Sequence, residues 1–334
     1  MFAITGKAVT DTVTAATTDL NDRTIWEGHP PSLLFLYTFQ YCNFDFPGYI
    51  NILMKTLSLT IISDNTPHAP FQAEHGLALA LETDKGEKIL FDTGCGETFF
   101  PHLELLDLDP ASFPHLFLSH GHYDHTGALA PLLEKAPHLH VWYGKGAEKE
   151  RFSCHKGVPA KKISMPEPCR KALEKHPLQT VLATPMAMGN GFFLTGEIPR
   201  NTAEDTGGPF YFDPEKKEAD LIADERALLW EGGVLLQGCC HAGIGNTLEY
   251  CRKNFSHIPI HTVIGGLHLK DAGKERLEST KEFLLASGIK RLVLLHCTGE
   301  KGMDYLKNTL SSSLEILTPH AGEKLTLTEK GDLL

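Results

Sequence analysis

The chain has 334 residues, of which 42% are hydrophobic and 22% are charged, a composition typical of a globular protein with a sizeable core. Its formal net charge of −11 argues against a general nucleic-acid or membrane-surface binder, because both depend on a basic footprint. Eight scattered cysteines form no C-x-x-C pair and no disulfide framework, so we expect reduced thiols and a cytoplasmic location.

Residues 1–53 differ from the rest of the chain, because a Thr/Ala/Asp-rich stretch without periodicity precedes aromatics interrupted by prolines. The apolar run 33–39 is shorter than the roughly 20 residues that span a bilayer, and it does not follow a basic start. Neither a membrane span nor a secretory signal is therefore expected. We expect Met54 to be the natural start and residues 1–53 to be a poorly ordered leader or an upstream extension of the reading frame. An N-terminal arm that packs its aromatics on the body is the alternative.

From residue 56 onward, apolar runs suited to strands alternate with segments suited to helices. Strands are predicted at 56–62, 76–82, 87–94, 115–120, 139–144, 191–196, 219–224, 226–232, 233–240, 260–266, 290–297 and 324–329. Helices are predicted at 97–109, 124–136, 245–255, 274–288 and 303–312. Interleaved helices and strands favour one layered α/β domain over residues 54–334, with 145–190 as an irregular insertion between two halves of similar strand content.

The segment LSHGHYDHTGAL (118–129) places His120, His122, Asp124 and His125 within six positions, directly after an apolar strand. A strand end and turn can direct the first two histidines at one point, while the next helix turns Asp124 and His125 toward a neighbouring point. Imidazole and carboxylate ligands suit zinc, manganese or iron. Two such ions would clamp the attacking and leaving oxygens of a hydrolysed bond. The spacing therefore predicts a site for one or two divalent metal ions.

Further metal-binding side chains follow other apolar runs. His241, His268 and His296 each stand in a Gly- or Cys-flanked turn where a strand ends, and Asp92 ends another strand in the same way. Any one of these histidines alone would be an ordinary core or surface residue. Together with the first segment they predict one shared site. Three cysteines stand beside these residues, namely Cys239, Cys240 and Cys297. We interpret them as small buried hydrophobic residues rather than nucleophiles.

The ordered set FDTG, SHGHYDHTG, GCCHAGIGN and LLHCTG resembles the metallo-β-lactamase fold superfamily, whose first large motif is H-x-H-x-D-H. The motifs GCCHAG, IGGLHL and HCTG are similar to those of the branch named after dihydropterin ribofuranosylaminobenzene phosphate synthase. The resemblance covers roughly residues 55–330. It implies a four-layer αββα sandwich with the metal ions at one edge of the two sheets.

The resemblance also implies roles for individual residues. The first metal would be bound by His120, His122 and His241, and the second by Asp124, His125 and His296. Asp92 matches an early aspartate that usually orients the ligands. Most two-metal members place a bridging aspartate in a later strand that ends in G-D, but the candidate strand here ends at Gly265, Gly266, Leu267 and His268. Either His268 takes a metal or substrate role there, or one ion binds tightly and the other weakly.

Charge in the insertion suggests an anionic substrate. Residues 145–175 contain nine basic and four acidic side chains, a local excess in a chain that is acidic overall. If this segment overhangs the metals, it would attract a phosphate- or carboxylate-bearing substrate, with Lys161 and Lys162 as anion contacts and Arg200 at the rim. A solvated charged face is the alternative. Glu74 and His75 are expected beside the site, because a similar E-H-G turn lies there in the resembling branch.

The leading hypothesis is a metal-dependent hydrolase that uses metal-activated water on a small anionic, phosphate-containing substrate. Asp124 would hold the water and accept its proton, and His268 would stabilise the oxyanion or protonate the leaving group. The first alternative is a transferase like the synthase of the resembling branch, and the second is a non-catalytic metal-binding or sensor protein. Zn²⁺ is the expected ion, with Mn²⁺ or Fe²⁺ as alternatives. A small-molecule substrate is expected as the partner, with neither nucleic acid nor membrane, and the oligomeric state is left open.

Overall fold

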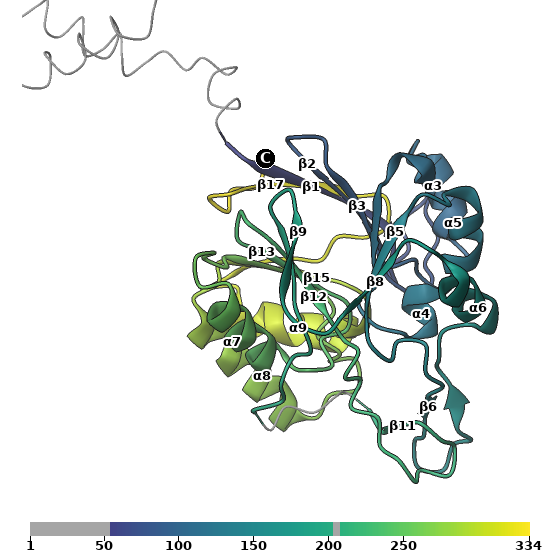
Figure 1. Cartoon of the computed structure of the whole chain (residues 1–334). Coiled ribbons are helices and arrows are strands. Elements are labelled where there is room, and N and C mark those ends of the chain that lie inside the picture. Colours follow the sequence, from purple (N-terminus) through teal and green to yellow (C-terminus); the bar gives the residue numbers. More distant parts are fainter. Residues whose placement is uncertain (1–53, 203–207) are drawn as a thin grey trace, which may run out of the picture. The chain divides into compact units, whose positions relative to one another are not determined.

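Two seven-stranded β-sheets pack face to face in the structure, a computed structural model that describes residues 54–202 and 208–334 (Figure 1). The first sheet takes most of its strands from the N-terminal part of the described chain. In spatial order these are β17 (Lys324–Thr328), β1 (Thr56–Ser63), β2 (Ala78–Thr83), β3 (Lys88–Phe91), β4 (His115–Phe117), β5 (His140–Gly144) and β8 (Gln179–Leu182). Strands β3, β4, β5 and β8 run parallel to one another.

The second sheet is built from the later part of the chain. In spatial order its strands are β16 (Glu315–Leu317), β15 (Arg291–Leu294), β14 (Thr262–Gly265), β13 (Val234–Gln237), β12 (Ala227–Trp230), β10 (Phe192–Leu194) and β9 (Met186–Gly189). Strands β13 to β16 are parallel. Because parallel neighbours end at the same edge of a sheet, the loops that follow them gather there, as ligand-binding loops do in α/β proteins.

Apolar side chains fill the space between the sheets. Leu59, Phe91 and Phe117 of the first sheet belong to the same buried cluster as Leu228 and Trp230 of the second. All residues of β12, β13, β14 and β15 are buried, so these strands are covered on both faces. This explains why their sequences are nearly continuous apolar runs rather than alternating patterns.

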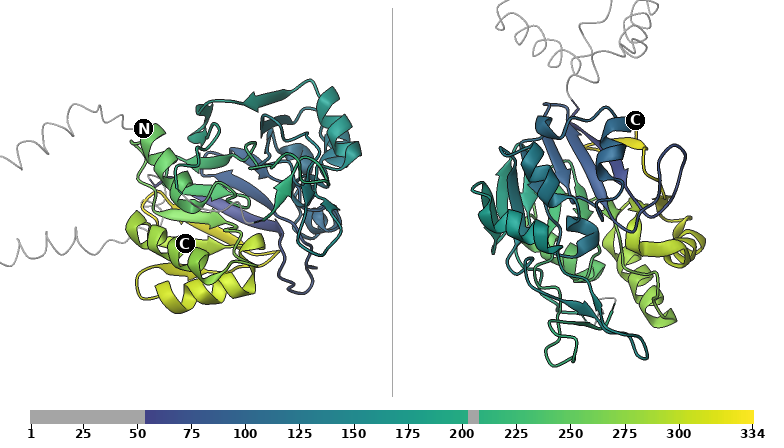
Figure 2. Two further views of the ribbon diagram at one scale, coloured as in Figure 1. Left: turned by 90° about the horizontal axis from the view of Figure 1, so that it is seen from below. Right: turned by 90° about the vertical axis from the view of Figure 1, so that its right-hand side faces the viewer.

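Helices cover the outer face of each sheet (Figure 2). One outer cluster joins the first sheet to α3 (Phe99–Leu105), α5 (Leu129–Lys135) and α6 (Glu167–Lys175). A second joins the other sheet to α7 (Ile244–Asn254), α8 (Lys274–Ser287) and α9 (Gly299–Leu310). The short elements are α4 (Tyr123–Thr126) and the 3₁₀ helices η1 (Pro110–Ser112) and η2 (His296–Thr298). The predicted four-layer αββα sandwich is confirmed.

Three predicted elements differ from the structure. The strand expected at 219–224 is wrong, because Ile222 has a positive φ of 54° and its carbonyl accepts the Glu225 N–H in a turn. Residues 145–190 are not irregular throughout, since they contain α6 and β8. Helix α6 buries only Cys169 and Leu173, so its apolar signal is sparse. The helix expected at 124–136 is interrupted at Gly127, whose N–H donates to the Gly94 carbonyl.

A small three-stranded sheet projects beyond the strand ends (Figure 1). It consists of β11 (Phe210–Tyr211), β6 (Phe152–Ser153) and β7 (Lys161–Lys162). It is joined to the sandwich at Tyr123, whose N–H donates to the Ile163 carbonyl at 3.1 Å and whose ring packs on Ile163, Phe210 and Ile222. Most of the predicted insertion therefore lies around this small sheet and α6.

Residues 55–334 form one compact unit. The predicted leader, residues 1–53, lies outside the described residues. Within residues 54–202 and 208–334, no helix combines the length and the apolar character that a bilayer crossing requires.

Candidate metal centre

Loops from both sheets meet where the parallel strands end. The loop after β4 carries His120 and His122, and α4 carries Asp124 and His125. The loops after β13 and β15 bring His241 and His296 to the same place. Because His125 Nε2 lies 3.2 Å from the sulfur of Cys239, which precedes α7, the two sheets contribute to one site.

Three histidines form the first half of this site. His120 Nε2 lies 2.9 Å from His122 Nδ1, and the ring of His241 is centred 5.0 Å from that of His120 and 5.1 Å from that of His122. Two nitrogens bound to one tetrahedral zinc ion would lie about 3.3 Å apart, given Zn–N distances of about 2.0–2.1 Å. The observed nitrogen separation is close to that value.

The second half combines Asp124, His125 and His296. The rings of His125 and His296 are centred 4.9 Å apart, and Asp124 Oδ2 lies 3.6 Å from His296 Nε2. Asp124 Oδ2 also lies 3.2 Å from His75 Nε2, so His75 stands beside the site. Burial would raise the pKa of Asp124, but the neighbouring imidazoles of His296 and His75 hold it well below its usual range. Asp124 is therefore ionised at neutral pH.

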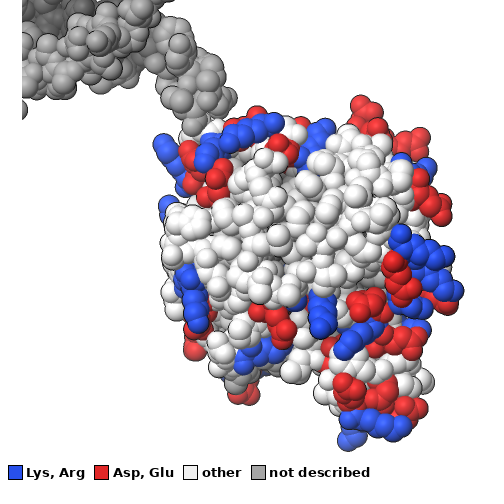
Figure 3. All heavy atoms as spheres, viewed as in Figure 1, with Lys and Arg blue, Asp and Glu red and all other residues white. Residues whose placement is uncertain are grey.

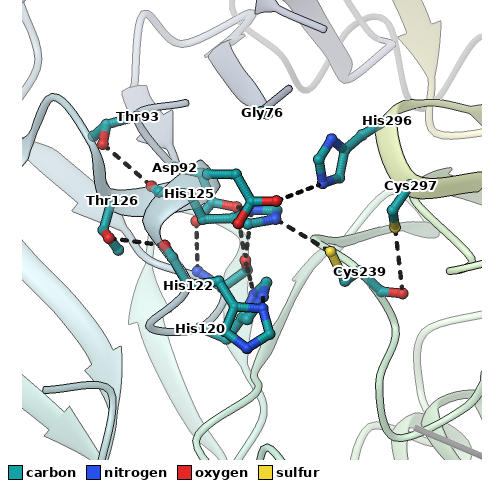
Figure 4. Close-up of polar contacts among 12 residues, drawn as sticks. Gly76, Asp92, Thr93, His120, His122, His125, Thr126, Cys239, His296 and Cys297 are labelled. Atoms are coloured by element: carbon teal, nitrogen blue, oxygen red, sulfur yellow. Dashed lines mark hydrogen bonds and ion pairs between the residues drawn. The ribbon is translucent and has the colours of Figure 1, made fainter. Parts of the chain in front are cut away.

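Asp92 connects the two halves (Figure 4). One carboxylate oxygen accepts His125 Nδ1–H at 2.6 Å, and the carboxylate also accepts the backbone N–H and the hydroxyl of Ser119, each at 2.6 Å. This contact leaves His125 Nε2 facing the centre of the site, as a metal-bound histidine requires. The Ser119 hydroxyl lies 3.0 Å from His120 Nδ1 and restrains that ring in turn.

Two residues that follow β1 hold His296. Asp64 Oδ1 accepts the backbone N–H of His296 at 2.7 Å, and Asn65 Oδ1 lies 2.8 Å from His296 Nδ1. Neither residue was singled out by the sequence, although Asp64 follows a strand just as Asp92 does. Glu74 has a different place, because its carboxylate accepts the N–H groups of Cys95, Glu97 and Thr98 and so fixes the turn before α3.

Two glycines allow the loops to approach one another. A Cβ on Gly121 would lie 1.9 Å from the Ala147 carbonyl oxygen, so the loop between the first two histidines admits no side chain there. A Cβ on Gly238 would lie 2.2 Å from the Ser119 hydroxyl oxygen. Gly238 therefore lets the β13 loop of the second sheet reach the histidine loop of the first.

The side chains fit a metal ion. His296 Nε2 is buried and has no hydrogen-bond partner among the described residues, a costly state that a bound cation would relieve. Burial lowers the pKa of His120 and of His122 well below the usual range, so both imidazoles are neutral, as ligands must be. The donor set of imidazole nitrogens with a carboxylate and a thiol suits zinc or another transition metal.

Cys239 is the donor that sequence reasoning missed. Its sulfur belongs to two groups of potential ligand atoms. Within each group, all the ligand atoms lie within 4.8 Å of one another. One group contains His120 and His241, and the other contains His125 and His296. A cysteine at the end of an apolar run carries no sequence signal that separates a ligand from a packed side chain.

A pocket of about 280 Å³ opens above this site. Asp124, His122, His268 and His296 line its base together with Cys239. Phe210 of β11 covers one side. The centre of its ring lies 5.5 Å from that of His122 and 5.3 Å from that of His241. The small sheet thus forms a wall of the pocket, and residues 153–163 supply most of that wall.

Of the three predicted anion contacts, Lys161 alone lines this pocket. Its Nζ donates to the Tyr123 hydroxyl at 2.8 Å and lies 4.6 Å from the centre of that ring. Lys162 points the other way and pairs with Glu150. Arg200 donates to the carbonyls of Ile198 and Leu221 and does not line the pocket.

Several basic side chains of the insertion are paired with acidic ones and are not free to contact a substrate. Lys171 pairs with Glu167 and Arg170 with Glu174 on α6. In the face shown in Figure 3, positive and negative side chains are interspersed on the projecting part rather than gathered by sign. The local field therefore comes from particular side chains in the pocket, where Lys161 is joined by Lys270 and His155.

His268 lines the pocket but is not a member of either group of ligand atoms. Its ring is centred 4.7 Å from that of His241 and 6.0 Å from that of Phe210. Burial lowers the pKa of His268 to about 4, so its imidazole is neutral near pH 7. This position allows a contact with substrate, and the metal-ligand role stays the other prediction.

Comparison with known proteins agrees with this geometry. Residues 73–225, which include the first histidine segment, match the family model of the Metallo-beta-lactamase superfamily. The chain contains a metallo-β-lactamase superfamily domain. The crystal structure of a metal-dependent hydrolase of the beta-lactamase superfamily superposes with a TM-score of 0.68 at 27% identity, covering 81% of this chain and 99% of that one.

Two curated relatives come from Methanocaldococcus jannaschii. A 7,8-dihydropterin-6-methyl-4-(β-D-ribofuranosyl)-aminobenzene-5'-phosphate synthase is 29% identical over 82% of this chain and 96% of its own length. An uncharacterized protein of the same organism is 28% identical over 74% of this chain and 93% of its own length. The domain thus resembles both a hydrolase and a synthase at similar identity, and the superfamily does not by itself distinguish the two reactions.

Proposed function

We propose that this metallo-β-lactamase domain is a metal-dependent hydrolase of small, phosphate-bearing metabolites. The observation that carries the proposal is that imidazoles and a carboxylate from both sheets form the base of one pocket whose wall carries Lys161 and Lys270. Zn²⁺ is the proposed native ion. The proposal includes a cytoplasmic location and a small-molecule substrate rather than a nucleic acid or membrane.

The residues of the site have different roles: some would hold the metal ions, some bind the substrate, and some accept or donate a proton. Divalent cations held by the histidines and Asp124 would supply Lewis acidity, which lowers the pKa of water from 15.7 to about 7. Asp124 is ionised and stands at the base of the pocket, so its Oδ2 accepts a proton there and His75 Nε2 lies 3.2 Å away to share it. His268 directs an imidazole N–H at negative charge that develops on the substrate. Lys161 and Lys270 bind the anionic group.

A transferase is the second candidate, because the curated relative that matches over 96% of its own length is a synthase. The same pocket would then hold a sugar-phosphate donor and an aromatic or pterin-bearing acceptor. In that case Phe210 and Tyr123 would offer ring faces to the acceptor.

Elemental analysis of the purified protein tests the metal site. We expect His122→Ala to lose half or more of the bound metal, and unchanged metal content would refute the assignment.

A panel of phosphate esters, assayed with and without added Zn²⁺ or Mn²⁺, then tests the reaction. Metal-dependent release of phosphate from single substrates supports the hydrolase. Turnover only when a second organic substrate is present supports the transferase, and metal binding without turnover of either kind supports a sensor.

A further inference from the structure

Cys239 occupies a position between the two halves of the metal centre. It lies in the loop between β13 and α7, and its sulfur is 3.2 Å from His125 Nε2 (Figure 4). Only 2% of the residue is exposed. It is the one residue shared by the two groups of potential ligand atoms found among the described residues.

Packing does not explain this cysteine. Cys240 and Cys251 belong to the apolar cluster between the second sheet and its helices, and Cys169 belongs to the cluster on the other side. Cys239 is a member of none of the four apolar clusters, and it lines the pocket instead. Its neighbour Cys240 points toward the Thr247 hydroxyl at 3.9 Å. Two adjacent cysteines thus face different surroundings.

We propose that the Cys239 thiolate bridges two metal ions in this site. The first ion would be bound by this sulfur and by nitrogens of His120, His122 and His241. The second ion would be bound by the same sulfur and by Asp124, His125 and His296. Each set supplies four protein donors, and a fifth position on zinc would take the water that the proposed function needs. The buried His296 Nε2, which has no hydrogen-bond partner among the described residues, is the second observation that points to an ion here.

The bridge accounts for the departure of this sequence from most two-metal members of the superfamily. Those members use an aspartate after a glycine in a later strand, where this chain has Gly266, Leu267 and His268. The sulfur of Cys239 reaches the space between the two sets from another loop. Binding breaks the S–H bond, forms metal–sulfur bonds and releases one proton to solvent, with no change of oxidation state. A thiolate ligand favours zinc over manganese or magnesium.

Cobalt(II) spectroscopy tests the bridge. Loading metal-depleted protein with Co²⁺ should give a thiolate-to-cobalt charge-transfer band in the near ultraviolet with two ions bound per chain. Cys239→Ala should abolish the band and lower the affinity for both ions by more than the roughly 10–100-fold that the loss of an outer-shell partner costs. Cys239→Asp, which keeps an anionic bridge, should bind both ions without the band. Cys240→Ala and Cys297→Ala are matched controls that should keep it.

The outcomes separate this proposal from the proposed function, on whose metal site it rests. Two cobalt ions bound to the wild-type protein without a sulfur band would overturn the bridge and leave the metal site intact. Loss of only one ion in Cys239→Ala would also overturn it, since a ligand of a single ion would behave so. Failure of the wild-type protein to bind cobalt would refute both proposals. A band without turnover of any phosphate ester would refute the hydrolase and support the bridge.

Discussion

Glu225 accepts the backbone N–H of His241 at 2.6 Å. The other oxygen of the same carboxylate accepts the N–H of Ala242, also at 2.6 Å, and only 3% of Glu225 is exposed. Burial raises the pKa of Glu225, and the two backbone donors oppose that rise. The carboxylate therefore fixes the main chain of the loop from which His241 projects.

Replacing Glu225 with glutamine should weaken metal binding by about 10–100-fold, because one acceptor oxygen becomes an amide that faces a backbone donor. Competition with a chromophoric chelator measures the affinity. Glu231→Gln is the matched control, since Glu231 pairs with Lys55 at the surface and should leave the affinity unchanged. Equal affinities for Glu225→Gln and the wild-type protein would show that the loop holds His241 without this carboxylate.

Lys161 and Lys162 are adjacent but face opposite sides of β7, which gives a second prediction. Lys161→Met should raise KM for an anionic substrate about tenfold and change kcat little, as expected for the loss of one charge-assisted hydrogen bond worth about 1.5 kcal/mol. Lys162→Met should leave both constants unchanged, because Lys162 pairs with Glu150 away from the pocket. Steady-state kinetics on both variants measure KM and kcat. Equal effects of the two substitutions would contradict the role of Lys161 as the lysine that contacts the substrate.

The parts of the site that the sequence predicted share one property. His120, His122, His241 and His296 each stand in the short turn that follows an apolar run, so the strand, its end and the candidate ligand are visible in one short stretch of sequence. Their convergence was inferable because parallel strands end at a common edge. The sandwich followed from the same runs, whose length and lack of alternation match strands covered on both faces.

Other features depend on partners that are distant in the sequence. The count of basic residues in the insertion could not show that Lys162 and Lys171 pair with acidic neighbours, or that Arg151 is buried. Phe210 sits in a two-residue strand, too short to give a periodic signal, yet it covers the histidines. Cys239 looked like a small core residue because only the three-dimensional arrangement shows what its sulfur faces.

A buried ion pair secures the small sheet to the histidine loop. Asp224 Oδ1 accepts Arg151 Nη1–H at 2.8 Å, and its Oδ2 accepts the Gly121 N–H at 2.8 Å. Asp220 lies 3.2 Å from Arg151 Nε on the same guanidinium. Only 1% of Arg151 and 2% of Asp224 are exposed, so the pair is shielded from solvent.

Asp224→Ala should therefore lower the free energy of unfolding by about 3–5 kcal/mol, because it leaves Arg151 buried with reduced compensation. Lys171→Ala, which removes one partner of the exposed pair with Glu167, should leave the free energy of unfolding almost unchanged. Urea denaturation of both variants in metal-free buffer gives the comparison. A cost for Asp224→Ala as small as that of Lys171→Ala would mean that water reaches the guanidinium.

The buried position of His261 predicts that the folded protein loses part of its stability as the pH falls. Its Nε2 lies 2.6 Å from the Gly232 carbonyl oxygen and its Nδ1 lies 2.9 Å from the Thr262 hydroxyl, contacts that suit a neutral imidazole. Burial lowers the pKa of His261 below its usual value of 6.5. As pH falls below about 6.5, the unfolded chain takes up a proton at this position before the folded protein does, so stability falls with pH.

His261→Gln should consequently flatten the decline of the melting temperature between about pH 7 and pH 5, because glutamine can still donate to Gly232 but does not titrate. The variant starts from a somewhat lower melting temperature, and the informative quantity is the slope against pH rather than the value at one pH. His138→Gln is the control, since His138 is exposed and should leave the slope as it is. If the slope of His261→Gln matched that of the wild-type protein, the proton uptake that weakens the fold would have to occur at other groups, such as His115, whose pKa burial also lowers.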